Sequence, residues 1–104
     1  MSVPQTKLDA RERVSQLLKA ALAVSCEVGY MKVTRAQIAQ RVGVASSLVP
    51  YHLGTAAQMR RAIMREALRV ECLPVIAQGL AARDRHALKA EPELRARALQ
   101  SLAS

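Results

Sequence analysis

Apolar residues recur at steps of three and four along residues 9–28, which is the spacing of an amphipathic helix with one buried face. Gly29 follows and is predicted to end the helix, because glycine adopts the left-handed conformation without steric cost. The chain has no long run of β-branched residues, which would favour a sheet. We therefore predict an all-α fold. The apolar stripe of this first helix consists of Val14, Leu17, Leu18, Ala21, Val24 and Val28.

Two short sequences of the same kind predict where two further helices begin. In T-R-A-Q, residues 34–37, and in T-A-A-Q, residues 55–58, a threonine stands three residues before a glutamine. The hydroxyl accepts from the backbone N–H three residues on, and the glutamine reaches back, which makes a capping box. The first of these helices is short and ends at Gly43. Their inward-facing residues are predicted to be Ile38, Ala39 and Val42 in the first, and Met59, Ile63, Ala67 and Val70 in the second.

The C-terminal part of the chain is predicted to add one or two short helices. Pro74 and Pro92 are each expected in the first turn of a helix, where the missing N–H costs nothing. The polar segment RDRHALKAE, residues 83–91, is predicted to be a loop between them. The last helix is expected to carry an apolar stripe of Leu94, Ala98 and Leu102, with Leu99 beside it.

With 104 residues the chain is expected to form one small folded unit. We predict a flexible N-terminal arm over residues 1–8, a helix-turn-helix DNA-binding domain over 9–72, and a short helical dimerisation region over 73–104. The alternative for the last region is that its helices fold back on their own domain. The N-terminus lacks an apolar signal core, and no stretch is long and apolar enough to cross a bilayer. A cytoplasmic location without membrane contact is therefore expected, and Cys26 and Cys72 are predicted to be buried, reduced thiols.

The positive charge of the chain is concentrated in one window. The formal net charge is +8, and no acidic residue stands between Glu27 and Glu66. Elsewhere along the chain the signs alternate, as they do on an ordinary solvated helix. A window without acids favours a polyanionic partner. Its basic residues include Lys32, Arg35, Arg41, Arg60, Arg61 and Arg65.

The order of elements inside this window is typical of a helix-turn-helix. A short capped helix is followed by a turn at Gly43-Val44, a second short helix and a longer helix. Ala39 is small where the second helix crosses the first, and Ile38 and Val44 are expected to anchor the pair in the core. An ordinary αα-hairpin within a helical bundle is the structural alternative.

Residues 17–63 resemble the N-terminal DNA-binding domain of the TetR/AcrR transcriptional repressors. The shared features are an alanine-rich first helix that ends in Gly29-Tyr30, then Val33-Thr34, Ile38-Ala39 and Gly43-Val44, and finally the run His52 to Thr55. The resemblance covers about half of the chain. Family members also carry a large C-terminal domain that binds an inducer, and residues 73–104 are too few to enclose a pocket of that size.

Three departures from the family pattern affect the predicted recognition helix. Ala45 stands where the family has a capping residue, so the cap is expected to shift to Ser46. Ala56-Ala57 replaces Lys-Glu, so Arg60 or Arg61 is expected to take over the phosphate contact. Pro50 replaces a tyrosine in the last half of a helix predicted from Ala45 to Tyr51 or His52. We predict that Pro50 tightens or kinks this helix and re-aims Tyr51.

The resemblance implies which residues contact DNA. Ser46, Ser47, Leu48 and Tyr51 face the major groove, where Leu48 suits a thymine methyl group. Phosphates are expected near Thr34, Arg35, Tyr51, His52 and Thr55. Alternatives remain open: the two threonines act as caps only, His52 is a packed structural residue, or the arginines of residues 60–65 form a solvated face. The full predicted set is Thr34, Arg35, Ser46, Ser47, Leu48, Pro50, Tyr51, His52, Thr55, Arg60 and Arg61.

These features predict a homodimeric transcriptional repressor on a palindromic double-stranded DNA operator. Control is expected through the protein's own concentration, competition or a co-repressor protein, without a small-molecule inducer, as suits a plasmid or phage regulator. Catalysis, a cofactor and a metal are not expected, because His52 and His86 have no ligand spacing around them and no phosphate-binding loop occurs. The alternative function is a basic helical protein–protein adaptor or an antitoxin-like subunit.

Overall fold

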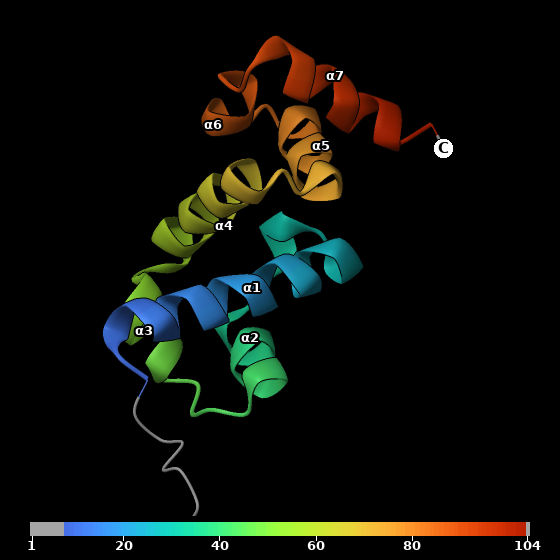
Figure 1. Ribbon diagram of the computed structural model, residues 1–104. Helices are drawn as coiled ribbons and strands as arrows, with labels where there is room; N and C mark the ends of the chain where they lie inside the picture. The colour runs from blue at the N-terminus through green and yellow to red at the C-terminus, as the bar shows by residue number, and fades with distance from the viewer. Residues whose placement is uncertain (1–7, 104) are drawn as a thin grey trace, which may run out of the picture.

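The structure, a computed structural model, describes residues 8–103 and contains helices but no strand in that range, which confirms the all-α prediction. The predicted arm of residues 1–8 lies outside the described residues, apart from an exposed Leu8. The elements are α1 (Ala10–Val28), the 3₁₀ helix η1 (Tyr30–Lys32), α2 (Arg35–Val42), α3 (Leu48–Leu53), α4 (Ala56–Val70), α5 (Leu73–Ala81), α6 (Arg85–Leu88) and α7 (Pro92–Ser101) (Figure 1).

Capping boxes begin three of these helices. The Thr34 hydroxyl accepts from the Gln37 N–H at 3.1 Å, and the Gln37 side chain accepts from the Thr34 N–H at 2.9 Å. Thr55 and Gln58 form the same pair of bonds at the start of α4, at 3.1 and 2.8 Å. Both predicted caps are therefore confirmed. A third box, which the sequence reading missed, starts α1 at Asp9.

Glycines end the first two α-helices of the fold, as predicted. Gly29 has φ of 92° after α1, and Gly43 has φ of 85° and ψ of 36° after α2. Their N–H groups donate to Ser25 and Ala39, each at 2.8 Å. Residues with a Cβ rarely adopt such backbone angles, so each glycine sets the point where the chain turns away from the helix axis.

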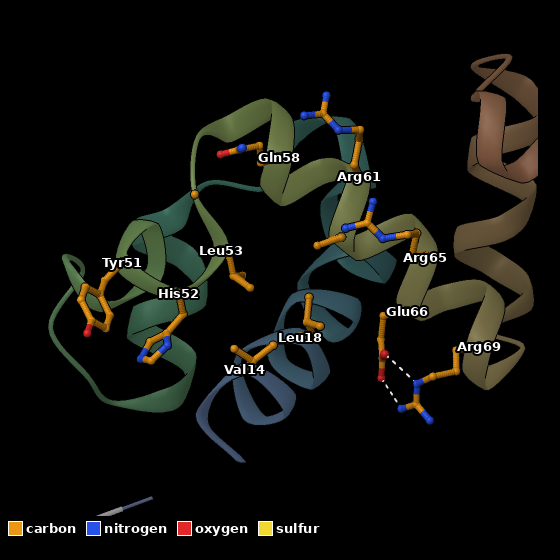
Figure 2. A pocket seen from close by; sticks show the side chains of 12 residues that line it. Val14, Leu18, Tyr51, His52, Leu53, Gln58, Arg61, Arg65, Glu66 and Arg69 are labelled. Carbon is orange, nitrogen blue, oxygen red and sulfur yellow. Dashed lines mark hydrogen bonds and ion pairs between the residues drawn. The ribbon is translucent and has the colours of Figure 1, made fainter. Parts of the chain in front are cut away.

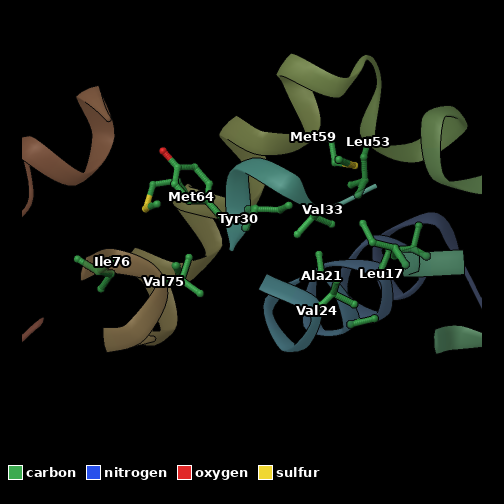
Figure 3. Close-up of a cluster of buried hydrophobic side chains, with 14 of the residues drawn as sticks. Leu17, Ala21, Val24, Tyr30, Val33, Leu53, Met59, Met64, Val75 and Ile76 are labelled. Carbon is green, nitrogen blue, oxygen red and sulfur yellow. The ribbon is translucent and has the colours of Figure 1, made fainter. Parts of the chain in front are cut away.

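The core lies between α1 and the helices that surround it, and it continues into α5 (Figure 3). The predicted inward residues Leu17, Ile38 and Ile63 are fully buried. Val28 and Val70 were predicted to be inward and are instead 36% and 45% exposed. Each is the last residue of its helix, beyond the turns that pack on the core. Other buried members are Ala21, Val24, Tyr30, Val33, Ala39, Val49, Met59, Met64, Ala67, Val75, Ile76 and Ala98.

Three helices, rather than one or two, follow α4. Pro74 and Pro92 lie in the first turns of α5 and α7, as predicted. The segment predicted as a loop contains α6, because the Asp84 carboxylate accepts from the N–H groups of His86 and Ala87 at 2.8 and 3.1 Å. Ala87 is fully buried against the core, which explains why so polar a segment is ordered as a helical turn.

Polar contacts attach α5 and α6 to the junction between α1 and η1. The Gln78 side chain accepts from the Tyr30 N–H at 2.8 Å and donates to the Ser25 carbonyl at 3.0 Å. The Tyr30 hydroxyl donates to Asp84 at 3.0 Å. Residues 73–103 therefore pack on the rest of their own chain through α5 and α6. None of the helices between residues 8 and 103 has both the length and the apolar character that a bilayer crossing requires.

The two cysteines meet in the fold despite their separation in sequence. Burial raises the pKa of the Cys26 thiol, and the Cys72 thiol, to which it hydrogen bonds, raises it further. The prediction of two buried thiols is wrong for Cys26, which is exposed, while Cys72 is half-buried.

Candidate nucleic-acid interface

The turn between α2 and α3 is longer than predicted. Helix α3 begins at Leu48, and Ser46 and Ser47 lie in the preceding turn, where the Leu48 N–H donates to the Ala45 carbonyl at 3.0 Å. Ser47 occupies the N-cap position, but its side chain makes no capping hydrogen bond. The predicted start near Ala45, with a cap at Ser46, is therefore wrong.

Pro50 explains the later start. In a helix from Ala45, Pro50 would be interior, without an N–H to donate and with its ring against the Ser46 carbonyl. In α3 it is the third residue, where an N–H has no partner within the helix. The predicted place of Pro50 in the last half of the helix is wrong, because Pro50 belongs to the first turn, and the re-aiming of Tyr51 stays a prediction.

The first turns of α2 and α4 open on one side of the molecule. Thr34 and Arg35 at the start of α2 line a hollow of about 290 Å³ together with Ala56 and Arg60 of α4 and Lys32 of η1. Arg35 also lines an adjoining hollow of about 400 Å³ with Ala36, Ser46, Ser47 and Pro50. We call this pair of hollows the Arg35 surface. Arg35 therefore joins two groups of predicted DNA-contacting residues, those at the start of α2 and the two serines before α3.

The electrostatics of the Arg35 surface are uniformly positive. None of the described residues that line it is acidic. Lys32, Arg35 and Arg60 form no ion pair within residues 8–103. The first turns of α2 and α4 also lack acidic residues, so their N–H groups and helix dipoles add positive potential.

The remaining predicted residues are not all on this surface. Tyr51, His52 and Arg61 line a separate cleft of about 710 Å³ between α1, α3 and α4 (Figure 2). Tyr51 is 80% exposed, and its ring meets the His52 ring edge-on with centroids 4.8 Å apart. Thr55, exposed, and Leu48, half-buried, line neither the hollows nor this cleft. Arg65, which was outside the predicted site, also lines the cleft.

No cluster of three or more histidine, cysteine or acidic side chains within residues 8–103 is placed to hold a metal ion. The chain matches no protein-family model, no curated protein and no solved structure. The resemblance to the TetR/AcrR repressors therefore stays a prediction from sequence motifs.

Proposed function

We propose that the protein is a sequence-specific DNA-binding repressor that acts as a homodimer on a palindromic operator. One observation supports this above the others: the first turns of α2 and α4, with Lys32, Arg35 and Arg60, form an acid-free surface next to Ser46 and Ser47. Helix N-termini and unpaired cations on one face are suited to phosphate groups. Serine hydroxyls beside them are suited to base edges.

The phosphate contacts are assigned to Arg35, Arg60 and the free N–H groups of the two first turns. Arg35 lines both hollows, so it is placed to hold a phosphate between the α2 start and the turn before α3. Thr34 and Thr55 keep their hydroxyls in the capping boxes, which leaves other first-turn N–H groups available to an anion. These contacts supply affinity that falls steeply with salt.

Base reading is assigned to the turn before α3 and to the exposed side of that helix. Ser46 and Ser47 are exposed, and their hydroxyls accept from or donate to any base edge, so they discriminate weakly. Leu48 offers an apolar contact for a thymine methyl group. Because α3 has only six residues, we expect a short recognition element and a modest preference from each half-site.

The homodimer is proposed through the C-terminal helices. Leu88, Leu99 and Leu102 are 43%, 53% and 65% exposed around a groove of about 350 Å³. Arg95 lines the same groove, and its Nε–H is buried without a hydrogen-bond acceptor. The exposed leucines, the groove and the unsatisfied donor lie on one surface. Such a surface suits the self-complementarity that a two-fold interface requires. The second copy would cover the leucines, and Arg95 could gain an acceptor there if its side chain turned outward.

Regulation is proposed to act without an inducer, through the protein's concentration or a partner protein, in the cytoplasm where the DNA lies. The test is a gel-shift titration at several salt concentrations. Retained preference for one duplex over bulk DNA at physiological salt supports the repressor. Purely electrostatic binding that disappears with salt supports the adaptor alternative.

A single substitution sharpens this test. Arg35→Ala is expected to weaken binding to all duplexes alike and to lower the salt slope by about 1. Arg85→Ala is the matched control, since Arg85 is an exposed arginine on α6 that lines neither hollow of the Arg35 surface. Equal effects of the two substitutions would contradict the assignment of Arg35.

A further inference from the structure

The cleft between α1, α3 and α4 differs in chemistry from the Arg35 surface. It measures about 710 Å³, and its α4 wall runs from Gln58 to Arg69. The eleven helical steps between these two residues make the wall about 16 Å long, which is three turns of a helix. Val14 and Leu18 of α1 form the floor beside this wall, and α3 closes one end (Figure 2). The cleft is thus an elongated groove on the surface.

Cations dominate the rim of this cleft. Arg61 and Arg65 are exposed, lie one turn apart on α4 and form no ion pair within residues 8–103. The one acid of the lining, Glu66, is held by Arg69 through hydrogen bonds of 2.9 and 2.6 Å. His52 adds a polar ring at the α3 end. Two positive charges of the rim therefore have no ion-pair partner among residues 8–103.

The floor of the cleft is apolar. Val14 and Leu18 of α1 are half-buried, and Leu53 of α3 is 7% exposed between them and α4 (Figure 2). Ala62 adds a small side chain on the α4 wall. Val14 and Leu18 stand four residues apart, so they present a continuous apolar strip along one turn of α1.

We propose that this cleft binds an acidic amphipathic helix of a partner protein. The apolar face of such a helix would lie on Val14, Leu18 and Leu53, and its carboxylates would pair with Arg61 and Arg65, in the helix-in-groove mode. A DNA backbone fits less well, because phosphodiesters have no apolar group to cover the floor. The length of the α4 wall matches three turns of the incoming helix.

The position of the cleft gives this partner a route to control DNA binding. Tyr51 and His52 line the cleft and belong to α3, the proposed recognition helix. An acidic occupant would cover both residues and place negative charge beside the DNA-facing surface. DNA and the partner are therefore expected to exclude each other. This consequence rests on the proposed function, whereas binding of the helix itself does not.

The test uses the whole protein and a fluorescein-labelled peptide of 16 residues, with leucines at steps of three and four and glutamates elsewhere. We expect saturable binding without DNA, and methyl chemical-shift changes at Val14 and Leu18. A peptide with glutamine in place of each glutamate is expected to bind about tenfold more weakly. A peptide that keeps the glutamates but has serine for leucine is expected to lose the methyl shifts.

Arg65→Glu is the test variant and Arg85→Glu its matched control, since both arginines are exposed and neither forms an ion pair within the described chain. Arg65→Glu is expected to weaken peptide binding about fivefold or more and Arg85→Glu to leave it unchanged, with circular dichroism confirming that both fold. Equal weakening by both, or shifts confined to other methyl groups, would overturn the proposal. If the protein bound the peptide as expected but did not bind DNA, the proposed function would be refuted and the proposed peptide site would be retained.

Discussion

The hydroxyl of Tyr30 donates a hydrogen bond to Oδ2 of Asp84 at 3.0 Å, across 54 residues of sequence. The other oxygen of the same carboxylate caps α6 by accepting from His86 and Ala87. One side chain thus orders a short helix and fastens it to the end of α1. The C-terminal helices are therefore held in a defined position relative to the Arg35 surface.

The Tyr30–Asp84 bond predicts a loss of stability at high pH. Burial, followed by the hydrogen bond to Asp84 and its charge, raises the pKa of Tyr30 from 10.0 to about 12. Because the folded pKa exceeds the unfolded one, this contribution is complete below pH 10 and is lost as the pH rises from 10 toward 12. Urea unfolding between pH 9 and 11.5 measures it. Tyr30→Phe should show a shallower fall over this range, and identical slopes would contradict the account.

At Gly79, helix α5 lies very close to α4 and α6. A Cβ at this position would lie 2.5 Å from the Met64 methyl carbon and 2.9 Å from the Ala87 Cβ. The methionine end is flexible, but the alanine Cβ moves only with its backbone. Gly79→Ala is therefore expected to destabilise the protein by about 1–3 kcal/mol despite the better helix propensity of alanine. A denaturation midpoint equal to or above that of the wild type would contradict this prediction and would mean that α6 moves aside at little energetic cost.

Thr34→Asp separates capping from phosphate binding. Aspartate is as good an N-cap as threonine, so the stability of α2 should be retained. Its negative charge would repel a phosphate on the Arg35 surface, and DNA affinity should fall about tenfold or more. Thermal unfolding measures the stability, and a gel shift with the same preparation measures the DNA affinity. Unchanged affinity would mean that Thr34 acts as a cap only.

Arg95→Met tests the proposed dimer. If Arg95 turns its Nε–H outward to an acceptor of a second copy, the substitution should weaken dimerisation about tenfold, as expected for a hydrogen bond to a charged group. If nothing supplies it, removal of an unsatisfied donor should leave association unchanged and raise monomer stability. Sedimentation equilibrium distinguishes these outcomes. Arg11→Met, at an exposed site on α1, is the control.

Local chemistry made most of the fold predictable. The caps at Thr34 and Thr55 and the stops at Gly29 and Gly43 depend on neighbours within four residues, and all were foreseen. The start of α3 was not, because the pattern favours a helix from Ala45 with Pro50 in its last half, whereas Pro50 in fact lies in the first turn. Helix α6 was missed although its Asp84 cap is local, because a polar segment gives no sign that Ala87 is buried against the core.

The candidate site was predictable as a charge window but not as a shape. The acid-free run from residue 28 to 65 identified most of the cations. The cations divide between the Arg35 surface and the cleft between α1, α3 and α4. This division depends on how α1 packs against α3 and α4, and the spacing of residues within the window does not predict that packing. Arg61 and Arg60 are adjacent in sequence, yet they line different hollows because they lie on different sides of α4.

The central claim is sequence-specific recognition of DNA, and selection of bound duplexes from a random pool at physiological salt tests it most directly. The account predicts enrichment of one site with two-fold symmetry, and loss of preference at a single base pair of each half-site in Leu48→Ala. A pool that stays random after repeated rounds, with binding that disappears as salt is raised, would contradict it.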